Sequence, residues 1–424
     1  MNYPAPRLHT RPPGNLLLHA ICAVLAYATA MATTDAPALA ASDGKKVSLS
    51  QQKRAVLAAP PEVLRKLGGH VIVGYYRSRQ LTPLLKRGAV GGVFMTRRNA
   101  RRRSRKQLAR EVERFRNLAA GNSARPLWIA TDQEGGLVAH LSPPLRRQKS
   151  LGRILRGAKT AEERKEIARS FAETQAVGLS ELGVNLNFAP VVDLKPKKRL
   201  RRDRRTHLIR RAISDDPDVI VEVAETYCNA LAGWRVLCTL KHFPGLQGVK
   251  ADTHIRQASL AKSRDELEAA DWIPFWSLTA TTPAAMMIGH AKLSAIDEDN
   301  PASASNLVVA ELLRDEWEYD GIIITDDLDM GAINRRAGGI SKASVDALRA
   351  GVDIILLTAD GDLVYQVLYA LLKAHERGEL DEAILARSRE RLDKYAERFA
   401  PQNNSWPKDM PVPTPAPHRS ARAD

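Results

Sequence analysis

The sequence predicts an α/β protein made of one closed barrel, in which eight parallel strands alternate with helices in the TIM-type (β/α)8 arrangement. From residue 70 to residue 357, short runs rich in β-branched residues alternate with longer segments whose apolar residues recur at helical spacing. Eight such units in roughly 300 residues suit a closed barrel. Ionisable residues also follow five successive strands, as expected where strand ends meet at one mouth. A doubly wound open sheet is the alternative.

The expected strands are the short apolar runs at residues 70–74, 89–95, 127–130, 184–190, 236–240, 285–289, 321–325 and 353–357. Helical spacing of apolar residues predicts helices between them at 161–182, 217–231, 264–279 and 305–317. A charged amphipathic segment at 379–399 is expected to close the barrel as its last helix.

The two ends of the chain differ from this pattern. Arg7 and Arg11 precede the apolar run 16–32, and small residues at 38–41 follow it, which is typical of a cleaved export signal over residues 1–40. An uncleaved membrane anchor is the alternative, because the run is close to the shortest length that spans a bilayer. We therefore expect an exported protein, periplasmic or extracellular, that is either free or anchored to the inner membrane by its N-terminus.

The expected domain organisation is a linker at 41–59, the barrel at 60–400 and a disordered tail at 401–424, which is rich in Pro, Ala and Arg. Nothing in the pattern requires a partner subunit, so we expect a monomer.

The formal net charge of +16 suggests affinity for polyanions. Two basic runs, 97–106 and 195–211, carry much of this charge. They are either ordinary solvated faces or a landing surface for an anionic cell-wall polymer. Nucleic acid is disfavoured as a partner, because an exported protein does not meet it and neither run contains an aromatic residue.

Three cysteines do not form a disulfide framework or a Cys-x-x-Cys metal pattern. Cys22 lies in the N-terminal apolar run, which leaves Cys228 in a predicted helix and Cys238 in a predicted buried strand. We expect these two to be free buried thiols, although an oxidising compartment would permit a bridge between them.

Ionisable side chains at the ends of the predicted strands are the candidate functional residues. In a closed parallel barrel they would ring a single mouth. They are Asp132, Asp193, Lys241, His242, His290, Asp326 and Asp327.

The loop beyond Lys241 adds a candidate proton-transfer pair. Asp252 and His254 lie two residues apart, so in a turn both side chains can point the same way and the carboxylate can orient the imidazole. Such a pair is a plausible general acid and base. The alternative is an Asx turn carrying a surface histidine.

Asp326 follows the apolar residues 322–324, so a buried strand would hold its carboxylate rigidly, as an anionic nucleophile requires. Near the third strand, Asp132 can accept hydrogen bonds from two sugar hydroxyls, and Gly135 and Gly136 permit close approach of the backbone.

The loop 241–254, Lys-His-Phe-Pro-Gly continuing to Asp-Thr-His, resembles the corresponding loop of bacterial β-N-acetylhexosaminidases in glycoside hydrolase family 3. Residues 131–136, 187–193, 210–217 and 321–330 resemble further elements of that family. The resemblance implies a retaining exo-β-N-acetylglucosaminidase that removes terminal N-acetylglucosamine from cell-wall fragments and needs no cofactor or metal.

On this resemblance Asp326 is the nucleophile, and His254 with Asp252 is the acid/base. The expected substrate-binding residues are Asp132, Arg211, Lys241, His242, His290 and His140. For His290 a supporting role behind the site is the alternative.

The sequence departs from the family pattern at two places. His140 stands where the family has a sugar-binding arginine, for which Arg146 or Arg147 could compensate, and residues 212–214 replace the usual Ser-Phe-Gly. The segment after Asp326 is too short for the further domain that supplies a glutamate acid/base in the family's β-glucosidases.

Two alternative functions remain open from the sequence. One is a β-glucosidase-like hydrolase of the same family. A second is a non-catalytic sugar-binding barrel, which loss of the arginine at position 140 would favour. A metal site of His242, Asp252, His254 and His290 is disfavoured, because no His-x-x-x-His pair is present.

Overall fold

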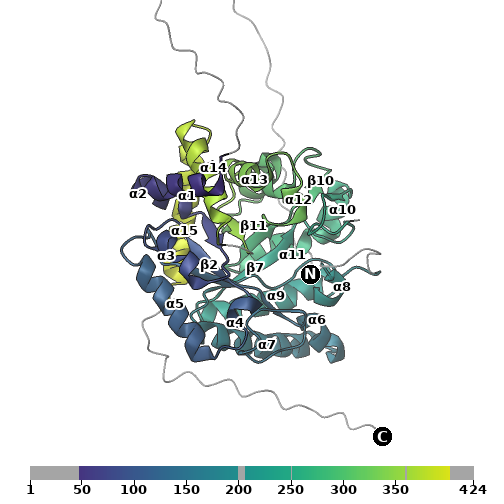
Figure 1. Cartoon of the computed structure of the whole chain (residues 1–424). Coiled ribbons are helices and arrows are strands. Elements are labelled where there is room, and N and C mark those ends of the chain that lie inside the picture. The colour runs from purple at the N-terminus through teal and green to yellow at the C-terminus, as the bar shows by residue number, and fades with distance from the viewer. Residues whose placement is uncertain (1–46, 199–205, 250, 359–360, 402–424) are drawn as a thin grey trace, which may run out of the picture. The chain divides into compact units, whose positions relative to one another are not determined.

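Eight parallel strands close into a barrel in the computed structural model of the chain (Figure 1), which describes residues 47–198, 206–249, 251–358 and 361–401. The first strand pairs with both the second and the last, so the sheet has no free edge. The predicted barrel is confirmed, and the open-sheet alternative is wrong. In barrel order the strands are β1 (Val71–Val73), β12 (Ile354–Leu357), β11 (Ile323–Asp327), β9 (Ala285–Ile288), β7 (Leu237–Phe243), β6 (Leu186–Asn187), β3 (Trp128–Thr131) and β2 (Gly92–Met95).

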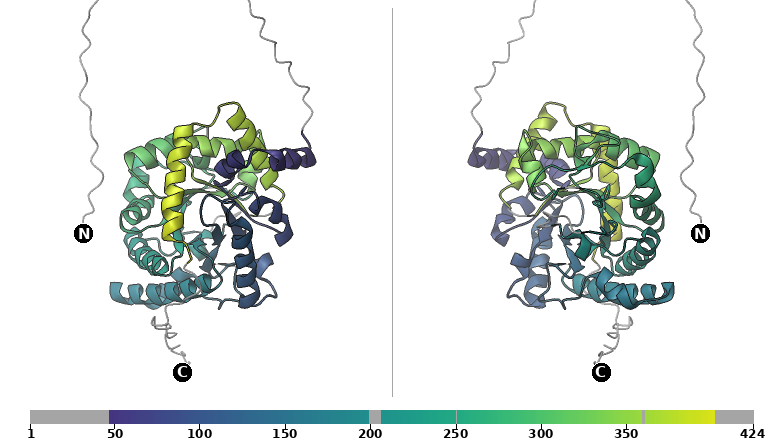
Figure 2. Two further views of the ribbon diagram at one scale, coloured as in Figure 1. Left: turned by 90° about the vertical axis from the view of Figure 1, so that its left-hand side faces the viewer. Right: turned by 90° about the vertical axis from the view of Figure 1, so that its right-hand side faces the viewer.

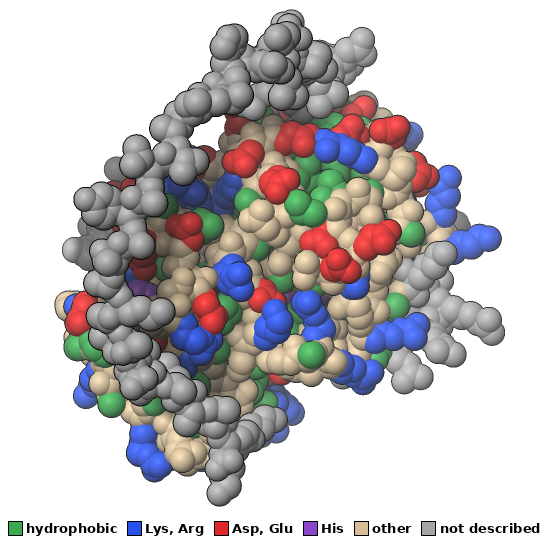
Figure 3. Space-filling view, turned by 90° about the horizontal axis from the view of Figure 1, so that it is seen from above, with side chains coloured by type: hydrophobic (Ala, Val, Ile, Leu, Met, Phe, Trp, Pro, Cys, Tyr) green, Lys and Arg blue, Asp and Glu red, His purple; other side chains and the backbone are tan. Residues whose placement is uncertain are grey.

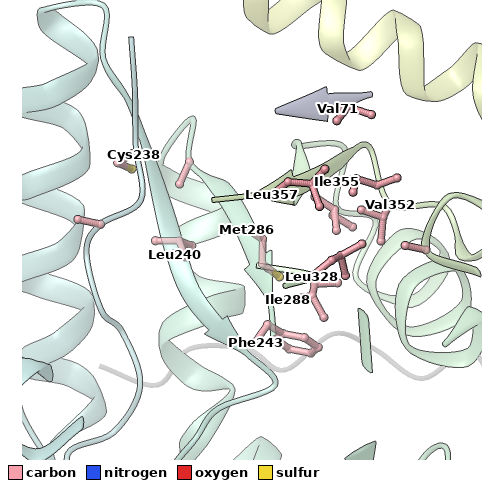
Figure 4. Packing of buried hydrophobic residues seen from close by; sticks show 14 of the residues in the cluster. Val71, Cys238, Leu240, Phe243, Met286, Ile288, Leu328, Val352, Ile355 and Leu357 are labelled. Atoms are coloured by element: carbon pink, nitrogen blue, oxygen red, sulfur yellow. The ribbon is translucent and has the colours of Figure 1, made fainter. Parts of the chain in front are cut away.

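Side chains of each barrel strand alternate between two cores, because successive residues of a strand point to opposite faces. In β12, Ile354 and Leu356 belong to the core inside the barrel, whereas Ile355 and Leu357 pack outside it against the surrounding helices (Figure 4). Each fully buried aliphatic side chain contributes about 1.5–3 kcal/mol. Both faces of the strands are therefore apolar, which explains why the sequence shows continuous apolar runs at the strands.

Helices surround the barrel, and several of the longer ones begin at capping residues. Thr160 accepts a hydrogen bond from the backbone of Glu163 at the start of α7, and Asp216 caps α9 in front of Pro217. The helices are α1 (Leu49–Ala58), α2 (Pro61–Gly68), α3 (Thr82–Leu85), α4 (Arg97–Ala100), α5 (Arg105–Ala119), α6 (Leu151–Ile154), α7 (Ala161–Glu181), α8 (Leu208–Arg211), α9 (Pro217–Gly233), α10 (Arg264–Glu266), α11 (Ile273–Thr281), α12 (Gly331–Asn334), α13 (Gly339–Ala350), α14 (Val364–Glu376) and α15 (Glu382–Arg398).

Short elements complete the description of the chain. They are the 3₁₀ turns η1 (Ser78–Gln80), η2 (Leu155–Gly157) and η4 (Ala302–Ala304), the π-helices η3 (Leu267–Asp271) and η5 (Leu307–Glu316), and the two-stranded sheets β4 (Gln133–Gly135) with β5 (Val138–Ala139) and β8 (Ser259–Leu260) with β10 (Lys292–Leu293). The helix predicted at 264–279 is thus divided among α10, η3 and α11. The helix predicted at 305–317 is the π-helix η5.

The last helix, α15, covers the end of the barrel where the strands begin (Figure 2). Its Leu392 and Tyr395, and Phe399 after it, join the core inside the barrel. Nδ2 of Asn185 also donates to the backbone oxygen of Phe399 across 3.4 Å. The prediction that this segment closes the barrel is confirmed.

Two expectations from the sequence are wrong. Residues 49–58 of the predicted linker form α1, whose Val56 is fully buried in the outer core, so the compact unit begins at Leu49. Cys228 and Cys238 are bonded as a disulfide and are not free thiols. Cys228 faces the barrel from α9 and Cys238 faces outward from β7, which brings their Cα atoms to 5.4 Å.

The predicted export signal and all of the predicted tail except Pro401 lie outside the described residues. Within the described part of the chain, no helix combines the length and apolar character needed to cross a membrane. Basic and acidic side chains are both exposed on the face in Figure 3, so the positive net charge does not cover that face uniformly.

A buried carboxylate, Asp353, ties several elements together where β12 begins. It accepts hydrogen bonds from Arg314 of η5 at 2.6 Å, from Arg391 of α15 at 3.1 Å and from the backbone of Ile323 at 2.8 Å. Asp353 is fully buried and the two arginines are nearly so. Removing it would leave Arg314 without its counter-charge and Arg391 with only the exposed Asp320, 3.8 Å away.

Asp353→Ala should therefore lower the free energy of unfolding by about 3–5 kcal/mol, as measured by chemical denaturation. The matched control is Lys342→Ala, which removes an exposed pair with Asp346 and should cost at most about 0.5 kcal/mol. Equal effects of the two substitutions would contradict the structural role of Asp353.

Candidate active site

A cavity of about 480 Å³ opens at the end of the barrel where the strands finish. It is lined by residues that follow or end several different strands, as expected from the sequence. The ionisable residues on its walls are Arg97, Arg98, Asp132, Glu134, His140, Arg211, Lys241, His242, His254, Asp326 and Asp327.

Asp326 lies in the wall of this cavity on β11, which runs through Asp327 and so extends beyond the predicted strand. An irregular register between Ile324 and Asp327 interrupts the pairing with β12 at this point. Burial alone would raise the pKa of the Asp326 carboxyl, but the imidazoles of His242, His290 and His254 lower it below its usual value. Asp326 is therefore an anion at neutral pH.

The neighbouring carboxylate of Asp327 differs from that of Asp326, because hydrogen bonds hold it in place. The backbone and hydroxyl of Thr358, after β12, both donate to it, as does the backbone of Asp329. Burial raises the pKa of Asp327 to about 6 in spite of these donors, and the charge of Asp326 adds to that rise.

Lys241 and His242 lie within β7, not after it as predicted, because this strand continues to Phe243. A register irregularity between Lys241 and Phe243 lets consecutive residues approach the mouth. Nδ1 and the backbone of His242 donate to Asp193, at 2.7 and 3.1 Å. Asp193 is fully buried and also accepts from the backbone of Leu246, so it fixes the start of the following loop.

Glu134 joins two buried cations into one network. Nε and Nη2 of Arg211 donate to its two oxygens at 2.9 and 2.7 Å, and Nζ of Lys241 lies 2.7 Å from the carboxylate. Burial would raise the pKa of Glu134, but the two cations lower it far below its usual range. Glu134 is thus ionised at neutral pH. Arg211 uses its Nε and Nη2 groups to bind Glu134, and it still lines the cavity.

Asp132 retains acceptor capacity toward the cavity. Its Oδ1 accepts from Lys241 at 2.6 Å, and its Oδ2 lies 4.0 Å from Nε2 of His140. The Lys241–Asp132–Glu134–Arg211 group carries two positive and two negative charges. The wall is consequently close to neutral and rich in hydrogen-bonding groups, which suits the hydroxyls of a sugar.

His140 lines the cavity with its ring edge-on to Phe94 at 5.9 Å. Burial lowers the pKa of His140, so it is neutral at physiological pH and does not replace the charge of an arginine. Arg147 lines a neighbouring cavity instead, and Arg97 and Arg98 of α4 supply the positive charge at this mouth.

His254 and Asp252 form the pair expected from their spacing. Nδ1 of His254 donates to Oδ1 of Asp252 at 3.0 Å, and Oδ1 also accepts from the backbone of His254 and from Thr206. The contact to the backbone is an Asx turn, so the turn considered as an alternative exists and serves to place the ring. Because Nδ1 carries the proton shared with the carboxylate, Nε2 remains to accept or donate a proton in the cavity that His254 lines.

The loop that carries His254 is docked on the segment that follows the strand of Asp326. The backbone of Gly331 donates to the oxygen of His254 at 3.0 Å, and that of Ala332 donates to Thr253 at 3.2 Å. A Cβ atom at position 331 would lie 2.5 Å from the oxygen of Ile255 and 2.9 Å from that of His254. Glycine at this position therefore sets the distance between the two halves of the site.

His290 is fully buried behind the cavity wall. Its Nε2 donates to the backbone oxygen of Asp327 at 3.0 Å, and its Nδ1 accepts from Ser303 at 2.8 Å. Burial lowers the pKa of His290, and the charge of Asp326 opposes that shift. Both nitrogens are engaged, so its position corresponds to the supporting role and not to a direct sugar contact.

The sequence places Asp193 among the candidate residues at the strand ends without a specific role, gives no role to Thr358, and includes Glu134 within the motif at 131–136. Asp193 was visible as an ionisable residue after a predicted strand. The partners of Glu134 come from β7 and α8, and no local signal in the sequence indicates them. In the described ranges, no three His, Cys, Asp or Glu side chains are grouped so that they could hold a metal ion.

An α/β barrel whose mouth presents a rigid carboxylate and a carboxylate-held histidine beside a polar cavity has the plan of a glycoside hydrolase. The sequence profile described as the glycosyl hydrolase family 3 N terminal domain matches residues 63–394, and the chain belongs to this family.

Curated relatives bear the name beta-hexosaminidase. The one from Xanthomonas oryzae pv. oryzae (strain KACC10331 / KXO85) is 33% identical over 303 residues, which cover 71% of this chain and 85% of the relative. The one from Tolumonas auensis is 34% identical over 275 residues, which cover 64% and 77%.

Solved structures show the same similarity. A family 3 glycosyl hydrolase from Mycobacterium smegmatis matches with 30% identity and a TM-score of 0.69, covering 80% of this chain and 98% of that one. A family 3 β-N-acetylglucosaminidase from Paenibacillus matches with 29% identity and a TM-score of 0.72, covering 80% of this chain and 62% of that one.

Gly331→Ala should displace the His254 loop while leaving the barrel folded. We expect about a 10- to 100-fold loss of turnover, because small misplacements of reacting groups are costly. Gly233→Ala is the control, since an added Cβ there meets no atom within 4 Å. Turnover is measured on an aryl glycoside and folding by circular dichroism, and unchanged turnover in Gly331→Ala would refute the docking role.

Proposed function

We propose that this protein is a retaining exo-β-N-acetylglucosaminidase that releases terminal N-acetylglucosamine from a glycan. The observation that carries the proposal is that the Asp252–His254 pair and the anionic Asp326 line the same cavity. The names of the β-hexosaminidase relatives support the choice of sugar.

The reaction follows from the positions of these groups. Asp326 attacks the anomeric carbon and forms a glycosyl-enzyme, while Nε2 of protonated His254 gives its proton to the leaving oxygen. Neutral His254 then takes a proton from the water that releases the sugar. Asp252 keeps the ring in one tautomer through both steps and stabilises its charged form.

Other groups in or near the cavity are less suited to transfer this proton. Glu134 is held ionised by Arg211 and Lys241, so it has no proton to give. His242 is tied to Asp193 through Nδ1, and its Nε2 lies 3.4 Å from Nη2 of Arg211, a group that can only donate. His290 has both nitrogens engaged behind the wall.

The substrate-binding roles assigned from the sequence stay predictions for Asp132, Arg211, Lys241, His242 and His140. Asp132 has the clearest case, because one of its oxygens is left toward the cavity. Arg211 and Lys241 act on substrate mainly by holding Glu134 and Asp132 in place. His290 is better assigned to support of the strand end at Asp327.

We further propose that the substrate is a cell-wall fragment and that the protein is exported and monomeric. The N-terminal sequence supports export, and the basic run 97–106 supports contact with an anionic wall polymer. Part of the second run, residues 199–205, lies outside the described residues. Within the first run, Arg103 is already paired with Glu111, whereas Arg98 stacks on the exposed ring of Tyr76.

An aryl β-N-acetylglucosaminide and an aryl β-glucoside, assayed side by side, test this activity directly. Wild type should hydrolyse the first far faster, and Asp326→Ala should lower turnover at least about a thousandfold. A 2-fluoro or 5-fluoro glycosyl reagent should label Asp326, as read by mass spectrometry. Preference for the glucoside, hydrolysis of neither compound, or labelling of another residue would each reject the proposal.

His254→Gly separates a proton donor from a positioning residue. Substrates with poor leaving groups should slow by about 100- to 10,000-fold, whereas activated aryl glycosides should slow far less, because a good leaving group departs without a proton. Asp252→Ala should give a milder version of the same pattern, since the imidazole stays but loses its orienting carboxylate. The measurement is a leaving-group series at several pH values for wild type and both variants.

The control is Lys342→Ala, whose exposed pair lies on α13 and which should leave the series unchanged. Equal loss on every leaving group in His254→Gly, with an unaltered pH profile, would show that His254 only positions the substrate.

A further inference from the structure

A second cavity, of about 510 Å³, lies beside the catalytic one and has a different electrostatic character. Among the residues that the structure describes, six basic ones and no acidic one line it. They are Arg147, Lys149, Arg153, Arg156, Lys195 and Arg210.

The six positive charges of this basic cavity have no carboxylate partner in the described part of the chain. Within the ranges that the structure describes, none of the six side chains forms an ion pair with a carboxylate. The catalytic cavity differs in this respect, because Glu134 and Asp132 neutralise its buried cations there. Six like charges around one hollow repel one another, and a bound anion would relieve that repulsion.

The backbone around the basic cavity is fixed, so the cations project from a stable frame. The backbone of Gly136 donates to Gln148 at 2.9 Å, and Nη2 of Arg147 donates back to the oxygen of Gly136 at 3.1 Å. A Cβ atom at Gly152 would lie 2.4 Å from the oxygen of Ala212, which shows how closely α6 packs on the end of α8. Lys195 is fixed through its own backbone, which donates to Ser214 at 2.8 Å.

The basic cavity and the catalytic cavity are immediate neighbours. Arg210 lines the first and the next residue, Arg211, lines the second. In the β4–β5 turn, Leu137 lines the first and Val138 lines the second. Because consecutive Cα atoms are about 3.8 Å apart, the walls of the two hollows adjoin at both places.

We propose that the basic cavity binds an oxyanion, a carboxylate or phosphate, carried by the same molecule whose terminal sugar enters the catalytic cavity. This inference rests on the proposed function. Arginine, which supplies four of the six cations, pairs with both oxyanions through two parallel hydrogen bonds. A nucleic acid is a poorer fit, because none of the described lining residues is an aromatic that could stack on a base.

The test compares two oligosaccharides that both end in N-acetylglucosamine and differ only at the far end. One is neutral there, and the other is oxidised to a carboxylate; a third version carries a phosphate. The protein variant is Arg153→Gln with Arg156→Gln, two exposed side chains whose loss should not affect folding. The matched control is Arg349→Gln with Arg387→Gln, which removes equal charge from two exposed positions outside both cavities and both basic runs.

We expect the cavity variant to raise KM about tenfold for the charged oligosaccharides, and added salt to reduce the difference from wild type. Its kinetics on the neutral oligosaccharide and on a small aryl glycoside should match those of wild type. A larger effect on the carboxylate than on the phosphate version, or the reverse, identifies the preferred oxyanion. Equal losses on neutral and charged substrates, equal effects of the control, or no loss at all would overturn the inference.

A binding assay keeps this result separate from the proposed function. Titration calorimetry of the charged and neutral oligosaccharides against the full chain reports on the basic cavity without requiring turnover. If wild type hydrolyses none of the substrates, the proposed function fails, whereas weaker binding of the charged oligosaccharide to the cavity variant still supports the oxyanion site. Equal binding of charged and neutral compounds by wild type would refute it.

Discussion

The rest of the structure depends on the closed ring of backbone hydrogen bonds in which β1 pairs with both β2 and β12. Closure removes every sheet edge and gives each strand an inner and an outer apolar face. It also forces all strands to end at the same mouth. Residues that are far apart in the chain, such as Asp132 and Asp326, therefore line one cavity.

Charge is distributed in opposite ways in the two neighbouring hollows of this mouth. In the cavity that Asp326 lines, buried cations are paired with carboxylates, so the wall is polar but nearly neutral, and Asp326, the proposed nucleophile, is anionic. In the basic cavity, exposed cations have no carboxylate partner in the described chain. A neutral sugar suits the first environment, and an oxyanion suits the second. The net charge of the protein thus has a local function beside the site and is not only a general surface property.

The segments that follow two strands determine where the Asp252–His254 pair lies relative to Asp326. The pair itself is local, since two residues and one Asx turn define it. Its distance from Asp326 is set by the contact of Gly331 with the oxygen of His254, which joins the loop after β7 to the segment after β11. The proposed acid/base His254 and the proposed nucleophile Asp326 are consequently held at a set distance, although about 70 residues separate them in the chain.

The sequence by itself determined the eight strands, the mouth residues at their ends and the spacing of Asp252 and His254, because apolar periodicity and short-range geometry are local properties. Only the tertiary structure decided the Cys228–Cys238 bond, the packing of α1, the pairing of Glu134 with Arg211 and Lys241, and the cavity formed by residues 147–156 with Lys195 and Arg210. Each of these joins segments that meet through long-range packing, and the identity of a charged residue does not reveal which distant residue will neutralise it. The sequence therefore does not show whether folding buries a basic residue against a carboxylate or leaves it facing a cavity that an anion can fill.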